Sequence, residues 1–176
     1  MRRRVAGLVA VAVLAGLVAG TVANAKSERG PTVIPRESSP AAARNLCPLP
    51  QRYRGAFEAA ARDTNLPLAL LVSVAEVESN LDHAARSEAG ARGLLQVMPP
   101  TAAELRLDPD RPDTNVLAGA RYLNLMLSRF GSADLALAAY NAGPSAVERY
   151  VGAPGGETIT YVANVNRLWQ RLQGCT

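Results

Sequence analysis

The feature that most restricts how this chain can fold is a mostly apolar run, residues 70–77, that ends at Glu78. On an α-helix, Glu78 shares a face with the residues three, four, seven and eight positions before it. Because such a face packs against other apolar groups, we expect the Glu78 carboxyl to be sheltered from bulk water. The residues on that face are all apolar: Ala75, Val74, Leu71 and Leu70.

Shelter from water changes the chemistry of a carboxyl group. Loss of hydration disfavours the charged form and raises the pKa, which keeps a carboxylic acid protonated near neutral pH and able to act as a general acid. Glu76 lies about 200° around the same helix, so it is the glutamate that we expect to face solvent. The alternative interpretation is structural: Glu78 only ends an amphipathic helix, and its side chain extends into water.

The rest of the chain predicts helices separated by turns. Apolar residues recur at helical spacing, and proline, glycine and asparagine mark the breaks. Asp113 or Thr114 is expected to cap one helix and Gly131 to end it. No segment predicts a convincing strand, although a short β-ribbon within residues 82–96 is compatible with the sequence. The predicted class is therefore all-α, or helix-dominated, with helices over residues 51–62, 67–78, 100–107, 113–130, 133–140, 144–150 and 157–172.

The beginning of the chain predicts export. Arginines at positions 2–4 precede an apolar run over residues 5–20, and Ala23-Asn24-Ala25 forms a small-x-small cleavage pattern. We expect a signal peptide over residues 1–25, cut after Ala25, and a location in the periplasm or the extracellular cell wall. An uncleaved anchor is the alternative, and this segment would then be the only part in the membrane.

Residues 26–46 are polar and contain prolines, which predicts a flexible linker before a single domain over residues 47–176. The whole chain has 19 Lys and Arg against 15 Asp and Glu, but three of these arginines and no acid lie in residues 1–25, which leaves 16 against 15. With so small a charge and no basic block, the composition does not indicate a nucleic-acid-binding protein.

The chain has two cysteines, Cys47 and Cys175, at the two edges of the predicted domain. In an exported protein an even pair predicts a disulfide, and two free thiols are the alternative. Two cysteines and the single histidine, His83, do not have the spacing of a metal site, so neither a metal nor another cofactor is expected.

Four motifs follow one another along the chain. Glu78-Ser79 comes first, then Ser-Glu-Ala-Gly-Ala-Arg-Gly-Leu-Leu-Gln-Val-Met-Pro at residues 87–99, Ala-Tyr-Asn-Ala-Gly-Pro at residues 139–144, and Glu-Thr-x-x-Tyr at residues 157–161. In this order and spacing, from about residue 66 to residue 169, they resemble the catalytic domain of the soluble lytic transglycosylases. The resemblance implies a goose-type lysozyme-like fold and cleavage of the glycan strands of peptidoglycan.

The resemblance also implies roles for individual side chains. Glu78 is expected to be the catalytic acid and then the base, with the hydroxyl of Tyr140 against it, unless Tyr140 is only a core aromatic. Gln96 is expected to line the cleft, where an amide can both donate to and accept from sugar substituents. Ser87 is expected to bond Glu78 or an N-acetyl group, unless it only caps a loop.

Three further residues, Asn141, Glu157 and Tyr161, are expected from the resemblance to contact substrate. Two of them have a structural alternative. Asn141 could serve only to stabilise the turn at Gly143, and Glu157 could be a first-turn acid favoured by the helix dipole.

The chemistry that the resemblance implies needs one carboxyl group where most glycosidases use two. No obvious partner for Glu78 stands out, because Asp82 and Glu88 lie in a polar loop and Glu157 is remote in sequence, although it could be near in space. The resemblance implies that one glutamate protonates the leaving oxygen and then accepts a proton from the sugar's own C6 hydroxyl, which attacks C1. The substrate's N-acetyl group is expected to assist, and the product is a 1,6-anhydromuramoyl end. The reaction is a lyase reaction that consumes no water.

Two other functions stay open. One is a hydrolase of the goose-lysozyme type on the same fold, and the other is a peptidoglycan-binding protein with an inactive site. The expected partner is the glycan strand, and the chain is expected to act as a monomer. Small transglycosylases of this kind often serve secretion or conjugation machinery, and that context fits as well as general wall turnover.

Overall fold

The computed structural model describes residues 46–150 and 154–176. The expected signal peptide, residues 1–25, and nearly all of the expected linker, residues 26–46, lie outside the described residues. Within the described part of the chain, no helix combines the length and the apolar character needed to cross a membrane.

The described residues form a helix-dominated fold without a β-sheet, which confirms the predicted class. A ribbon within residues 82–96 is compatible with the sequence; the structure has one isolated antiparallel bridge in that range, between Arg86 and Arg92, and a second between Arg92 and Val97, one residue beyond it. The helices are α1 (Gln51–Thr64), α2 (Leu68–Ser79), α3 (Pro99–Glu104), α4 (Pro112–Phe130), α5 (Ala133–Ala142), α6 (Pro144–Tyr150) and α7 (Gly156–Leu172).

Local sequence signals explain most of the helix boundaries. Pro112 occupies the first turn of α4, where the missing N–H needs no partner, and Gly131 ends the helix in the left-handed conformation with φ 67°. The prediction that Asp113 or Thr114 caps α4 is wrong, because the helix already begins at Pro112 and its N-cap position is Arg111. Asp113 lies instead in the first turn, and its carboxylate pairs with Arg111 at 2.9 Å.

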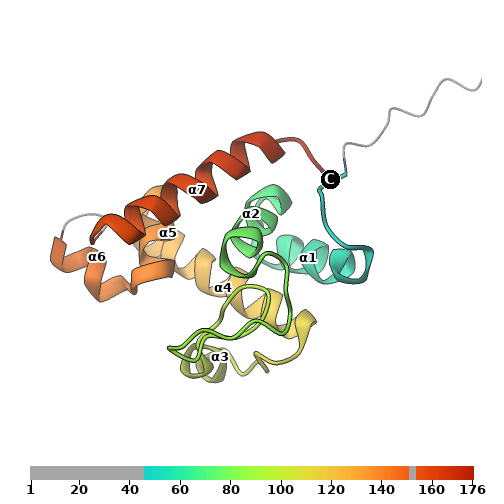
Figure 1. Cartoon of the computed structure of the whole chain (residues 1–176), viewed down its shortest axis with the longest axis horizontal. Helices are drawn as coiled ribbons and strands as arrows, with labels where there is room; N and C mark the ends of the chain where they lie inside the picture. The colour runs from blue at the N-terminus through green and yellow to red at the C-terminus, as the bar shows by residue number, and fades with distance from the viewer. Residues whose placement is uncertain (1–45, 151–153) are drawn as a thin grey trace, which may run out of the picture. The chain divides into compact units, whose positions relative to one another are not determined.

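Helix α2 is the most buried helix of the core. Its residues from Ala69 to Ala75 are all buried, so the apolar face predicted for Glu78 is inside the protein. Helix α7 packs along α2 and α5, and α4 packs against α1 and α5, as Figure 1 shows. The end of α2 therefore lies where α7 and the loop over residues 80–98 can both reach it.

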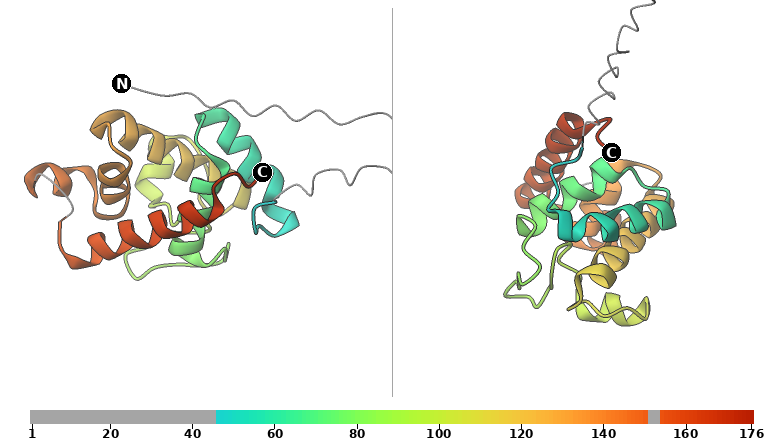
Figure 2. Two further views of the ribbon diagram at one scale, coloured as in Figure 1. Left: turned by 90° about the horizontal axis from the view of Figure 1, so that it is seen from above. Right: turned by 90° about the vertical axis from the view of Figure 1, so that its right-hand side faces the viewer.

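A disulfide joins Cys47 to Cys175, across 128 positions of the sequence, which confirms that prediction. It places the start of the domain beside the end of α7, and the left view of Figure 2 shows these two segments next to each other. The guanidinium of Arg54 adds to this junction by donating to the carbonyls of Cys47, at 2.9 Å, and Thr176, at 3.2 Å. These contacts anchor the C-terminal end of α7.

Candidate active site

Glu78 lies in the last turn of α2 and is partly buried. Burial raises its pKa from an ordinary value of 4.5 to about 7, and a hydrogen bond from Tyr161 opposes part of that rise. Loss of hydration is the larger effect because the group is surrounded by packed helices. Near neutral pH, Glu78 is therefore divided between its acid and its carboxylate form.

The side chain that holds Glu78 is Tyr161 of α7. Its Oη donates to Oε1 of Glu78 at 2.7 Å, and the tyrosine itself is buried. We expected Tyr140 to lie in this position and Tyr161 to contact substrate. The structure gives the hydrogen bond to Tyr161, because α7 packs directly along α2. Burial and the nearby charge of Glu78 hold the pKa of Tyr161 well above its ordinary value.

Tyr140 of α5 points its hydroxyl at the protein backbone instead. Its Oη donates to the carbonyl of Leu95 at 2.7 Å, and its ring packs against Tyr122 with the centroids 5.4 Å apart. Its pKa is raised well above the ordinary value, first by burial and then by the charge of Glu78. The charge of the Glu78 carboxylate thus affects the Tyr140 phenol, while the Tyr140 hydroxyl donates its proton to the Leu95 carbonyl.

Ser79, the residue after Glu78, ties the same loop to α2. Its Oγ donates to the carbonyl of Leu94 at 2.8 Å and to that of Ala75 at 3.1 Å. The two adjacent carbonyls of Leu94 and Leu95 therefore accept hydrogen bonds from the end of α2 and from α5. This segment of the loop joins the elements that carry Glu78 and Tyr140.

The side-chain amide of Gln96 forms hydrogen bonds within the loop over residues 80–98, which the sequence did not predict. Its Nε2 donates to the carbonyls of Gly93 at 2.9 Å and Ala85 at 3.2 Å. Because carbonyls can only accept, the amide nitrogen has to face them, and Oε1 is the atom left to meet a ligand. Gln96 does line a hollow on the surface, but its capacity to donate is used inside the loop.

Ser87 lies at an exposed turn of the same loop. Its Oγ accepts from the backbone N–H of Ala91 at 3.0 Å, and its backbone N–H donates to the carbonyl of Ala91 at 3.1 Å. These bonds match the structural alternative, a loop cap. A hydrogen bond to Glu78 is not among the contacts that the described residues make, and the other expectation, a bond to an N-acetyl group, stays a prediction.

Two hollows meet at Asn141, at the end of α5. The larger, of about 380 Å³, is lined by Tyr161 and by the exposed carboxylate of Glu157 in the first turn of α7. The smaller, of about 250 Å³, is lined by Gln96 and Tyr140. Oδ1 of Asn141 accepts from the hydroxyl of Thr158 at 3.0 Å, which fixes this amide between the hollows. Five expected site residues thus line these two hollows, Glu78 adjoins them through Tyr161, and Ser87 lines neither.

Two residues that matter for this arrangement were not predicted, Asn115 and Gly119 of α4. A Cβ at Gly119 would lie 2.6 Å from Cβ of Leu95 and 2.8 Å from Oη of Tyr140, so only glycine allows this approach. The signal in the sequence was present but weak: a glycine and an amide stand on the buried face of a helix whose other buried residues are mostly apolar.

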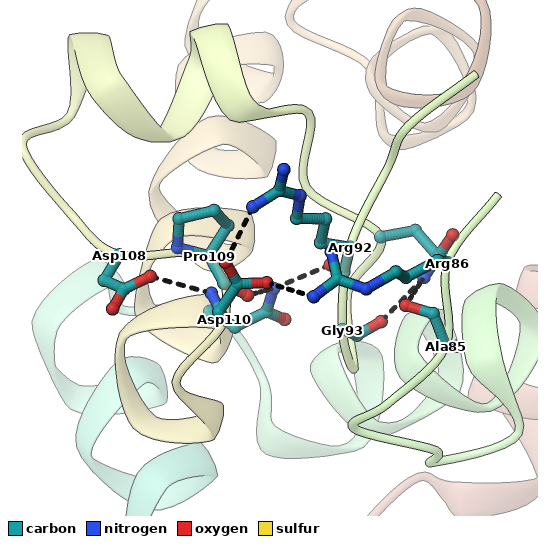
Figure 3. Close-up of polar contacts among 9 residues, drawn as sticks. Ala85, Arg86, Arg92, Gly93, Asp108, Pro109 and Asp110 are labelled. Carbon is teal, nitrogen blue, oxygen red and sulfur yellow. Dashed lines mark hydrogen bonds and ion pairs between the residues drawn. The ribbon is translucent and has the colours of Figure 1, made fainter. Parts of the chain in front are cut away.

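Two ion pairs also connect the loop over residues 80–98 to the turn before α4. Arg86 and Arg92, on two paired segments of the loop, both reach Asp110, at 2.9 Å and 2.6 Å, as Figure 3 shows. Exposed ion pairs of this kind contribute about 0–1 kcal/mol each to the free energy of unfolding. Their main effect is therefore to restrict the conformation of the loop. In residues 46–150 and 154–176, no cluster of three or more His, Cys, Asp or Glu is placed to hold a metal ion.

The family described as Transglycosylase SLT domain matches residues 55–162 of this chain. The soluble lytic murein transglycosylase of Salmonella typhimurium is 30% identical over 130 residues, which cover 66% of this chain and 20% of that protein. The membrane-bound lytic murein transglycosylase F 2 of Alkalilimnicola ehrlichii is 38% identical over 103 residues, which cover 52% of this chain and 22% of the relative.

Solved structures agree with these relatives. The 70 kDa soluble lytic transglycosylase of Escherichia coli superposes with a TM-score of 0.64 at 28% identity, covering 72% of this chain and 25% of that one. An inactive mutant of the lytic transglycosylase of Pseudomonas aeruginosa gives a TM-score of 0.63 at 29% identity, covering 73% of this chain and 25% of the other. The chain spans only about a fifth to a quarter of the length of these four proteins.

Proposed function

This chain belongs to the lytic murein transglycosylase family, and from that premise we propose that it cleaves the β-1,4 bond between MurNAc and GlcNAc in peptidoglycan, leaving 1,6-anhydromuramoyl ends. The observation that carries the proposal is the geometry of Glu78, a partly buried carboxyl with a pKa of about 7 held by one phenol. A group with this pKa can give up and regain a proton at neutral pH.

The first step uses the acid form of Glu78. Tyr161 donates to Oε1, and since the carbonyl oxygen of a carboxylic acid is a better acceptor than its hydroxyl oxygen, this bond favours the acid form with the proton on Oε2. From Oε2 the proton passes to the glycosidic oxygen as the bond from that oxygen to C1 breaks. The bond to Tyr161 therefore selects which oxygen carries the transferable proton.

The second step uses the carboxylate that the first step leaves. Glu78 accepts the proton of the sugar's C6 hydroxyl while O6 bonds to C1, which the substrate's N-acetyl group stabilises after the first step. Over the two steps the glycosidic C1–O bond breaks, the C1–O6 bond forms, and the glutamate regains its proton. No water enters the balance. Among the described residues, burial and Tyr161 account for the pKa of Glu78 and no second carboxylate contributes, which suits a mechanism with one acid.

The two hollows that meet at Asn141 are the proposed place for the glycan strand. They offer an amide oxygen from Gln96, the amide of Asn141 and the carboxylate of Glu157 on one surface. Hydroxyl and N-acetyl groups of sugars pair with such acceptors and donors. Ser87, at its exposed turn, is not proposed to touch the reacting atoms.

The products of digestion test this function. Purified sacculi are incubated with the enzyme and the released muropeptides are weighed by mass spectrometry. The proposal predicts muropeptides one water lighter than those with reducing ends. Products with reducing ends would support a hydrolase on the same fold, and no products at all would support a binding protein with an inactive site.

We further propose that the chain is exported to the periplasm or the extracellular cell wall, where its substrate lies, after cleavage behind Ala25. N-terminal sequencing of the exported protein decides this, since finding Met1 would contradict it. Deleting the gene and scoring wall turnover and conjugative transfer separately distinguishes general wall turnover from service to secretion or conjugation machinery.

A further inference from the structure

The backbone of Leu94 and Leu95 is the point where three helices meet the loop over residues 80–98. Helix α2 contacts it through Ser79, whose Oγ donates to the carbonyl of Leu94 at 2.8 Å. Helix α5 contacts it through Tyr140, whose Oη donates to the carbonyl of Leu95 at 2.7 Å. Both leucine side chains are fully buried, so this backbone segment is enclosed by the core.

The third contact comes from Asn115 of α4, a buried amide with 0% exposure. Its Oδ1 accepts from the N–H of Leu95 at 2.9 Å. Its Nδ2 donates to the carbonyl of Arg92 at 2.7 Å and to that of Pro109 at 2.9 Å. The two N–H groups and the oxygen of this amide are thus all engaged with backbone, on the loop and on the turn before α4.

The loop backbone at Gly93 approaches the Asn115 amide closely. Gly93 has a φ of +72°, and a Cβ added there would lie 2.6 Å from Nδ2 of Asn115. Figure 3 shows Arg92 and Gly93 facing Pro109 and Asp110, the two segments that Asn115 joins. A residue with a side chain at Gly93 would push the loop away from α4.

We propose that Asn115 is a positioning residue for the Glu78 site: by holding the Leu94–Leu95 backbone, it fixes both Ser79, the neighbour of Glu78, and the direction in which Tyr140 donates. With its proton committed to Leu95, the Tyr140 hydroxyl can only accept from groups on the other side. Asn115 touches neither Glu78 nor the proposed substrate path, so it acts through this backbone. The inference rests on the proposed transglycosylase activity.

The test compares Asn115→Ala with Val116→Ala. Val116 is the next residue of α4, is equally buried and has an apolar side chain, so its truncation weakens the same helix without touching the hydrogen bonds. Kinetics are measured on soluble uncrosslinked glycan strands, over a range of pH, at a temperature where both variants are folded. Asn115→Ala is expected to lower kcat by about 10- to 100-fold, because small misplacements of catalytic groups have effects of that size, with little change in KM.

The pH profile separates positioning from a general loss of stability. The titratable groups that face Glu78 from the described elements are Tyr140 of α5 and Tyr161 of α7. A loosened loop admits water to Glu78 and lowers its pKa, so the alkaline limb of the kcat profile is expected to move to lower pH. Val116→Ala is expected to keep kcat within about twofold of the wild-type value and to leave the alkaline limb of the kcat profile at its wild-type pH.

If Asn115→Ala does not fold, Asn115→Asp takes its place, because it keeps the shape and the acceptor for Leu95 but loses the two N–H donors. The inference would be overturned if a folded Asn115 variant had the same kcat as Val116→Ala and an alkaline limb at the same pH. A wild-type enzyme that releases no product from sacculi would instead overturn the proposed function, so the two failures are distinguishable.

Discussion

The phenol of Tyr161 and the carboxyl of Glu78, 83 positions apart in the sequence, share a hydrogen bond of 2.7 Å. The bond joins α7 to the last turn of α2, and it is the contact that sets the orientation of the proposed catalytic acid. It also works against burial, because a donor to the carboxylate lowers the pKa that loss of hydration raises.

Tyr161→Phe is therefore expected to lower kcat by about tenfold or more, because the carboxyl loses the donor that selects its proton-bearing oxygen. Loss of the same donor raises the pKa of Glu78, so the alkaline limb of the rate profile is expected to move to higher pH. The pH dependence of kcat on glycan strands measures both effects.

Tyr53→Phe is the matched control for that change. Tyr53 is buried in α1, and its hydroxyl is hydrogen-bonded to His83 at 2.9 Å. Its truncation is expected to leave kcat and the limb nearly unchanged. A limb that moves to lower pH in Tyr161→Phe would contradict the assignment of Tyr161.

Glu78→Gln is expected to stabilise the protein at alkaline pH. Folded Glu78 has a pKa of about 7 against an ordinary 4.5, so between these values the folded state keeps a proton that the unfolded state has released. Stability therefore falls as pH rises through this window. Glutamine avoids that loss, which amounts to about 1–3 kcal/mol above the window for a partly exposed group.

Thermal unfolding of wild type and Glu78→Gln at about pH 5 and about pH 8 checks this effect. The melting temperature of the variant is expected to exceed that of the wild type by a margin that widens with pH. A margin that stays constant would mean that Glu78 ionises as freely in the folded protein as in the unfolded chain.

Replacing both cysteines by serine is expected to destabilise the protein, because Cys47 and Cys175 close a loop of most of the domain. The expected loss in the free energy of unfolding is about 2–5 kcal/mol. Since the bridge lies at the far end of α7 from Tyr161, activity well below the melting temperature is expected to persist. Denaturant unfolding with and without a reductant measures the loss, and equal midpoints would contradict it.

Gly119→Ala and Gly55→Ala are expected to act in opposite directions. The new Cβ at position 119 meets Leu95 and Tyr140 at 2.6 Å and 2.8 Å, which is expected to cost about 1–3 kcal/mol and to lower activity. The new Cβ at position 55 meets nothing within 4 Å on the exposed side of α1, where alanine stabilises a helix by about 0.5–1 kcal/mol. Stabilisation by both changes would refute the close contact at Gly119.

The helices could be predicted from the sequence because their signals are local. The period of apolar residues and the positions of Pro112 and Gly131 give their extents within a few residues. The burial of Glu78 could also be predicted, since the face it shares on α2 is apolar throughout. These inferences need only the geometry of one helix.

The partner of Glu78 could not be predicted in the same way. Tyr140 and Tyr161 lie on different helices, and which phenol reaches the carboxyl depends on how α5 and α7 pack against α2. The donors of Gln96 could not be assigned to the loop for a related reason. A loop without regular hydrogen bonding has unpaired backbone carbonyls, and nearby side chains such as Gln96 are drawn in to satisfy them. Asn115 was missed because its three backbone partners come together only in the fold.

Release of muropeptides from purified sacculi by Glu78→Gln tests the central claim most directly, with binding to sacculi and the melting temperature measured beside it. The account predicts that the variant stays folded and bound while release falls by at least about 100-fold, because the amide has no proton to transfer. Release at close to the wild-type rate would show that another group supplies the proton.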